Sequence, residues 1–169
     1  GIVQTLMIHL MMLSFLRSLC KSKYAPYAGL VVYLLSDRYF KYTYYRYYAT
    51  LPQEFGMLFI LPAVYFAIAF LKEKDFGLTE KRKTVCSPAA RLYLILFSVS
   101  VSMTLAVHFY GTIITGLFCV GIGVGFCFRC FRWRYFKRLM VAGIEGFCIA
   151  VLYMAGVYVT GTPLQPSLN

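Results

Sequence analysis

Residues 92–128 read LYLILFSVSVSMTLAVHFYGTIITGLFCVGIGVGFCF and contain no Asp, Glu, Lys or Arg. As one α-helix these 37 residues would be about 55 Å long, nearly twice the roughly 30 Å hydrocarbon core of a bilayer. Two spans, Leu92–Tyr110 and Thr112–Phe128, fit a bilayer better, with a tight turn around residues 108–112. The stretch therefore predicts a transmembrane helical hairpin.

The flanking sequence contains two more apolar runs of spanning length: Phe55–Leu71, which is uncharged, and Leu139–Thr160, whose one charged residue is Glu145. Pro62 lies inside the first of them and predicts a kink. Nearer the start of the chain, Ile2–Leu16 and Tyr24–Leu35 are short for free-standing spans. We expect these two segments to lie in the interface, to re-enter the membrane, or to cross at an angle against other protein.

The composition excludes an ordinary soluble domain. Hydrophobic residues make up 60% of the 169 residues and charged residues 14%, and the mean hydropathy is +0.69. One soluble core in so short a chain does not hide this much apolar surface, and disorder requires low hydrophobicity. We predict an all-α, polytopic transmembrane bundle of about four spans. Its expected parts are an N-terminal membrane-associated or interfacial region (1–54), the bundle (55–162) and a polar tail (163–169).

The charged residues are distributed unevenly, and the formal net charge is +11. The loop over residues 72–91 has six basic and three acidic residues, and the loop over residues 129–138 has five basic and no acidic residues. A hairpin at 92–128 places both loops on one face, which the positive-inside tendency assigns to the cytoplasm or the mitochondrial matrix. Because no nucleic-acid-binding motif accompanies this charge, we expect no nucleic-acid partner.

A basic and aromatic cluster follows the hairpin directly. Cations beside a membrane surface attract anionic headgroups, so this cluster is a candidate site for anionic lipid such as cardiolipin. Determination of topology alone is the alternative explanation. The candidate residues are Arg129, Arg132, Trp133, Arg134, Lys137 and Arg138.

Three of the expected spans carry small residues at helical spacing, and such stripes let neighbouring backbones approach closely in lipid. The stripes are Ser98, Ser102 and Ala106 in the first arm of the hairpin, the GxxxG pair Gly121 and Gly125 in the second arm, and Ala142, Gly146 and Ala150 in the last span. We expect a packed bundle with residues 112–128 sandwiched between neighbours, which belong either to this chain or to other chains.

Glu145 is the one acidic residue inside an expected span with long uncharged flanks. A carboxylate at membrane depth is costly and marks a functional hypothesis. Two interpretations are open: a structural pairing with a hydroxyl or a cation, and proton or ion handling.

No catalytic constellation is present in the sequence. Cys127 and Cys130 form a lone CxxC, which lacks the further ligands of a closed zinc site. His9 and His108 are candidate axial haem ligands, although the ordinary interpretation is that each is a satisfied or interfacial histidine. Because there is no paired carboxylate, nucleophile–base set or phosphate-binding loop, we expect no enzymatic activity, no metal and no cofactor.

An aromatic belt segment lies between Tyr39 and Tyr48, where tyrosine rings suit the membrane–water interface. With the GxxxG of Gly121 and Gly125 and the basic matrix-type loops, this chain resembles the lineage-specific accessory membrane subunits of mitochondrial inner-membrane complexes, most of all those of divergent, euglenozoan-type ATP synthases. The resemblance implies a non-catalytic role in assembly, dimer contacts or cardiolipin binding, with other membrane subunits as partners. An accessory subunit of a respiratory-chain complex and a small transporter or channel that uses Glu145 are the alternatives.

Overall fold

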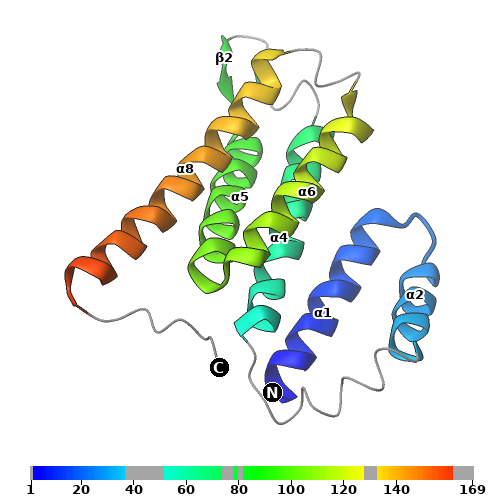
Figure 1. Ribbon diagram of the computed structural model, residues 1–169. Coiled ribbons are helices and arrows are strands. Elements are labelled where there is room, and N and C mark those ends of the chain that lie inside the picture. Colours follow the sequence, from blue (N-terminus) through cyan, green and yellow to red (C-terminus); the bar gives the residue numbers. More distant parts are fainter. Residues whose placement is uncertain (1, 37–51, 74–77, 80–81, 128–132, 162–169) are drawn as a thin grey trace.

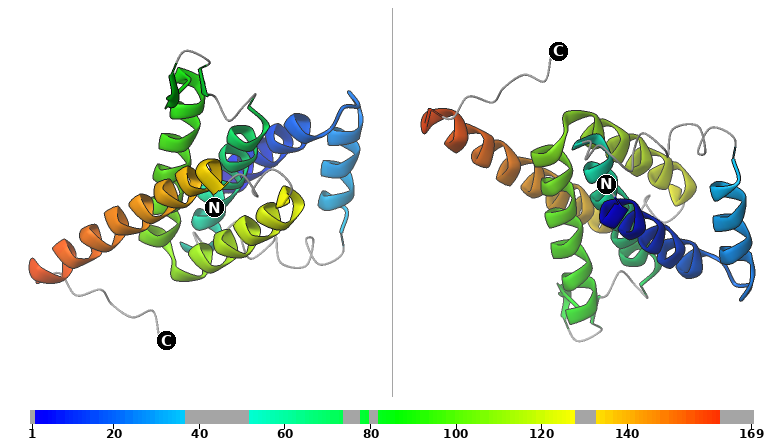
Figure 2. Two further views of the ribbon diagram at one scale, coloured as in Figure 1. Left: turned by 90° about the horizontal axis from the view of Figure 1, so that it is seen from above. Right: turned by 90° about the horizontal axis from the view of Figure 1, so that it is seen from below.

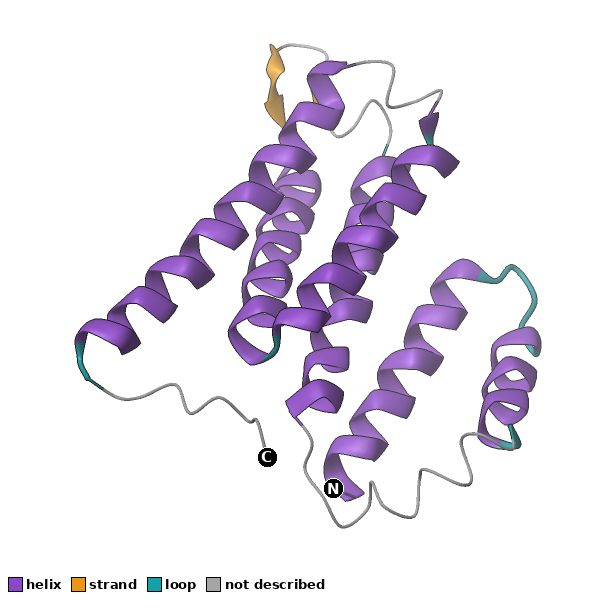
Figure 3. Cartoon of the chain, in the orientation of Figure 1, coloured by secondary structure: helices purple, strands orange, loops and turns teal. Residues whose placement is uncertain are grey.

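The computed structural model describes residues 2–36, 52–73, 78–79, 82–127 and 133–161 (Figure 1). Over these residues the chain is helical apart from one short antiparallel hairpin (Figure 3). The elements are α1 (Ile2–Leu19), α2 (Ala25–Leu34), α4 (Pro52–Lys72), β1 (Leu78–Thr79), β2 (Arg82–Cys86), α5 (Pro88–Val107), α6 (Phe109–Gly125) and α8 (Trp133–Val159). The predicted all-helical fold is confirmed at this level. The aromatic segment Tyr39–Tyr48 and the tail 163–169 lie outside the described residues.

Three of the described helices are long and apolar enough to cross a membrane: α1, α5 and residues Phe136–Val159 of α8. The prediction of about four spans is not confirmed. Helix α4 is 21 residues long and α6 is 17 residues long, and the apolar stretches described within them are Leu58–Lys72 and Tyr110–Gly125. Helix α1 is longer than the uncharged run that predicted it, since the helix continues through Arg17 to Leu19.

The 37-residue run is divided at His108, within the predicted turn. His108 is in an extended conformation between α5 and α6, with φ −162° and ψ 129°. Its ring nitrogen Nδ1 accepts a hydrogen bond from the backbone N–H of Tyr110 at 3.2 Å, which satisfies one of the free donors at the start of α6. The two rings stack with centroids 5.3 Å apart. A histidine cap therefore ends one helix and begins the next.

Helix α4 lies at the centre of the bundle and contacts α1, α5 and α6, while α8 packs on α5 (Figures 1 and 2). Pro62 lies inside α4, which continues through it. The core is made where α4, α5 and α8 meet, from buried small and large apolar side chains. Its members are Ala63, Ala67, Phe70, Leu71, Ala90, Phe97, Val101, Leu139 and Ala142.

One end of the bundle gathers the basic residues whose side chains are described in α4, α5 and α8. Helices α4 and α6 end there and α5 and α8 begin there, beside β2 (Figure 1). Lys72, Arg91, Lys137 and Arg138 lie at these helix ends, and we call this the basic end. Ser87 caps α5 at the same end, where its hydroxyl accepts the N–H of Ala90 at 3.2 Å.

We expect residues 86 and 160 to be labelled from opposite sides of the membrane. Cys86 lies at the basic end, and Thr160 follows the far end of α8. One variant keeps Cys86 as its single cysteine, and the other carries Thr160→Cys as its single cysteine; all other cysteines are changed to serine. An impermeant maleimide should reach residue 160 from the outer side and residue 86 only from the cytoplasmic or matrix side. Labelling of both positions from one side would contradict this arrangement.

Candidate functional site

Helices α5 and α8 cross at Ser98 and Gly146, which make the closest helix–helix approach at any described glycine. A Cβ added to Gly146 would lie 3.1 Å from the carbonyl carbon of Ser98 and 3.2 Å from its Cα. The backbones therefore touch at this crossing, and glycine at residue 146 permits it.

The small-residue stripes of α5 and α8 are only partly brought together. Ala142, Gly146 and Ala150 are all buried on the face of α8 that is turned to α5. On α5, Ser98 is buried, whereas Ser102 is half-buried and Ala106 is exposed. The reason is that α8 diverges from α5 towards its C-terminal end (Figure 2), so the last turns of α5 have no cover from α8.

The face of α6 that carries Gly121 and Gly125 does not pack against the described part of this chain. Gly121 and Gly125 are exposed, and a Cβ added to either would meet nothing within 4 Å among the described residues. Gly116 is the same, while Gly123 faces the ring of Phe136 at 4.0 Å. The expected sandwich therefore does not form within the described chain, because α4 and α5, which pack on α6, leave Gly121 and Gly125 uncovered. A GxxxG pattern indicates an interface but does not say which helix completes it.

The groove beside the α5–α8 crossing is the candidate functional site. Its volume is about 520 Å³, and Arg91, Lys137 and Arg138 line it together with Glu145. Its apolar wall consists of Leu94, Ile95, Val99, Val141 and Ile149. Cations at the mouth of this groove match the phosphate of an anionic lipid.

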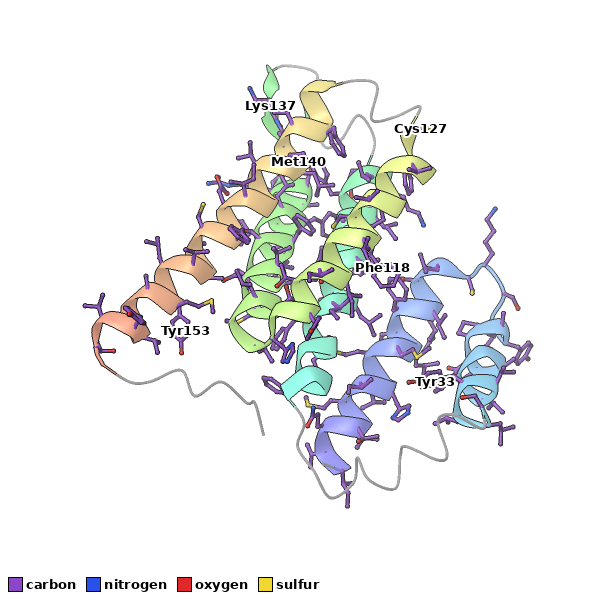
Figure 4. All side chains as sticks on the ribbon, in the orientation of Figure 1. Tyr33, Phe118, Cys127, Lys137, Met140 and Tyr153 are labelled. Atoms are coloured by element: carbon purple, nitrogen blue, oxygen red, sulfur yellow. The ribbon has the colours of Figure 1, made fainter. Side chains whose placement is uncertain are left out.

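Part of the predicted basic cluster reaches this groove. Lys137 lies beside β2 at the basic end (Figure 4), and an N–H of Arg138 donates to the thiol sulfur of Cys86, which ties β2 to α8. Trp133 and Arg134 belong to the first turn of α8, and their side chains are not described. The remaining predicted cluster members, Arg129 and Arg132, lie outside the described residues.

Arg91 is the groove residue that the sequence reasoning missed. It stands directly before the uncharged run of residues 92–128 and was counted only as part of a loop. The signal was available, because a predicted hairpin brings the flank before its first arm and the flank after its second arm to one face. Arg91 therefore belongs with Lys137 and Arg138 in one group.

Glu145 lies deeper in the same groove, and its side chain is exposed on the outer surface of the bundle. It follows Arg138 by seven residues, which corresponds to about 10 Å along the helix axis. Among the described residues no ion pair or hydrogen bond to Glu145 is present. Its carboxylate faces the lipid side of the groove, next to the small-residue crossing of α5 and α8.

A second, larger groove lies between α6 and α8, with α5 at its base. Its volume is about 740 Å³, and apolar side chains dominate it. Phe97 and Val101 form part of the base, and Thr112 and Thr115 lie at one end. Thr115 donates its hydroxyl to the carbonyl of Gly111 at 2.8 Å. This groove offers apolar contact area with few polar groups.

The candidate haem ligands His9 and His108 each contact backbone groups of their own or the adjacent helix, and no metal site forms around them among the described residues. His9 Nδ1 lies 2.6 Å from the carbonyl oxygen of Thr5, and His108 caps α6 as described above. Cys127 is a free thiol, and its CxxC partner Cys130 lies outside the described residues. Within the described part of the chain, no group of three or more His, Cys, Asp or Glu side chains is arranged to hold a metal ion.

We expect the basic groove to bind anionic lipid. Changing Arg91, Lys137 and Arg138 together to glutamine removes three surface cations, each worth about 1 kcal/mol towards an anionic headgroup. Native mass spectrometry should show fewer retained cardiolipin molecules than in the unchanged protein. The comparison variant is Lys21→Gln with Lys23→Gln, which removes two exposed cations between α1 and α2. Equal losses in both variants would refute a specific site.

No protein-family model matches this chain, and neither the curated proteins nor the solved structures contain a significant match to it.

Proposed function

We propose that this chain is a non-catalytic structural subunit of a multi-subunit complex in the mitochondrial inner membrane, most consistent with the membrane region of an ATP synthase. In this role its helices brace neighbouring membrane subunits, contribute to assembly or dimer contacts, and hold anionic lipid such as cardiolipin at the basic end.

The observation that carries this proposal is the uncovered small-residue face of α6. Gly121 and Gly125 are exposed on one face of this helix, and a Cβ added to either would meet nothing within 4 Å among the described residues. Small residues let neighbouring helices approach closely in a membrane. An open small-residue face is therefore expected of a subunit whose packing is completed by other chains.

The choice of complex rests on sequence rather than on geometry. The Tyr39–Tyr48 segment, the GxxxG pair and the basic loops resemble accessory membrane subunits of divergent ATP synthases. An accessory subunit of a respiratory-chain complex has the same general properties and remains the first alternative.

A small transporter or channel that uses Glu145 is the alternative from another functional class. Such a protein needs polar groups along a pathway between its helices. Glu145 instead lies in a groove on the outer surface of the bundle, with apolar walls. This position favours a contact with a neighbour over a pathway.

Extraction of tagged protein in mild detergent, a native gel and mass spectrometry of the co-migrating band test the proposal. We expect stoichiometric co-migration with ATP synthase membrane subunits. Co-migration with respiratory-chain subunits would support the assembly role and change the complex. Migration as a small, partner-free species would refute the proposal and direct attention to transport through Glu145.

A further inference from the structure

Glu145 lies on the exposed side of α8, whose residues Phe136–Val159 are long and apolar enough to cross a membrane, at the edge of the stripe that packs on α5. Ala142 and Gly146 are buried against α5, while the Glu145 side chain between them in sequence is exposed in the groove. At about 10 Å below Arg138, it lies about one third of the way through a hydrocarbon core of about 30 Å. A carboxylate at this depth requires a cation or a proton.

The basic side chains that the structure describes are not placed to provide that cation. Arg91 and Arg138 each lie about two turns nearer the basic end than the Ser98–Gly146 crossing, and long basic side chains extend towards water rather than into hydrocarbon. Arg138 also donates to Cys86. In α1, the guanidinium of Arg17 lies 5.9 Å from the ring centroid of Tyr27, near the end of that helix. The charge on Glu145 is therefore complementary to something outside the described chain.

A lipid headgroup does not meet this requirement. The phosphate of a lipid bound in the groove would lie level with Arg91, Lys137 and Arg138, and a headgroup amine lies on the water side of its phosphate. Such an amine would remain about 10 Å from Glu145. Below the cations, the groove has only apolar walls and the small residues Ser98 and Ala142, which suit the surface of a helix.

We propose that the groove between α5 and α8 receives a transmembrane helix of a different subunit, and that a Lys or Arg of this helix forms an ion pair with Glu145. This inference rests on the proposed function, because it requires a membrane assembly. It adds the position of one contact and the chemistry of the partner. The partner is a membrane-spanning helix with one basic residue about a third of the way through the hydrocarbon core, counted from the basic end.

Site-specific photocrosslinking in the assembled complex tests this contact. Photoreactive residues at Val141 and Ile149, one helical turn on either side of Glu145, should crosslink to a membrane-spanning peptide that contains a Lys or Arg. The matched control is Val151, which is 43% exposed on α8 and lies outside the groove. We expect little or no crosslinking of that peptide from Val151.

Charge variants identify the ion pair itself. Glu145→Gln keeps the shape of the side chain and should lower both groove crosslinks about tenfold, and Glu145→Asp should retain part of them. Glu145→Lys should abolish them, and changing the partner's Lys or Arg to Glu in that background should restore them. Restoration by charge exchange also excludes misfolding as the cause of the loss.

The outcomes separate this inference from the proposed function. If the chain co-migrates with a complex but Val141 and Ile149 crosslink only to lipid or to a second copy of this chain, the inference is wrong and the proposed function stands. Crosslinks that are unchanged in Glu145→Gln would also overturn it. If no complex forms around the unchanged protein, both are wrong.

Discussion

Gly146→Ala is expected to destabilise the bundle by about 2–3 kcal/mol, although it adds one methyl group. The new Cβ would overlap the backbone of Ser98, with its carbonyl carbon and Cα at 3.1 and 3.2 Å. Because backbone atoms do not move aside as a flexible side chain does, α5 and α8 must separate. The separation weakens contacts along the buried face of α8, at Leu139, Ala142 and Ala150.

Gly156→Ala is the matched control on the same helix. A Cβ at Gly156 would meet nothing within 4 Å among the described residues, so the change should be neutral or slightly stabilising, as alanine restricts the backbone more than glycine does. Unfolding of the purified protein by sodium dodecyl sulfate, followed by fluorescence of its single tryptophan, Trp133, measures both variants. A Gly146→Ala variant as stable as Gly156→Ala would contradict the close crossing.

Phe70→Ala is expected to lower the stability of the fold by about 3 kcal/mol, the lower end of the range for removing a buried phenylalanine ring from a core. The Phe70 side chain is fully buried in α4 and belongs to the core cluster with α5 and α8. In lipid the exposed alternative for the ring is also apolar, so the cost arises mainly from the lost packing contacts and the cavity.

Phe118→Ala provides the comparison for Phe70→Ala. Phe118 lies on α6 (Figure 4) and is 50% exposed, so removal of its ring should change the stability by less than about 1 kcal/mol. The same detergent titration applies to both. If the two variants lose equal stability, α4 is not the centre of the core.

The positions of charged residues predicted the hairpin, and the spacing of small residues predicted the packed face of α8. The hairpin of residues 92–128 follows from its length, and its break at His108 lies within the predicted turn. The face of α8 that carries Ala142, Gly146 and Ala150 was also visible in the sequence, because its spacing follows the helical repeat.

Features that depend on where helices end or on what they meet were harder to predict. Uncharged runs stop at the first charged residue, whereas a helix continues through it when the side chain reaches water; α1 therefore extends past Arg17. For the same reason the sequence pattern places Arg91 in a loop, although it belongs to α5 and lines the groove. The open glycine face of α6 was beyond prediction, since a spacing pattern contains no information about the partner helix.

The basic end also gives the folded chain an electrical polarity. Moving one elementary charge across a potential of 100 mV is worth about 2.3 kcal/mol, so the four cations Lys72, Arg91, Lys137 and Arg138, less the acidic Glu73 beside Lys72, correspond to about 7 kcal/mol. In an energised membrane with the basic end on the negative side, the voltage holds the inserted chain in its orientation. Collapse of the potential would remove this restraint while every packing contact stayed in place.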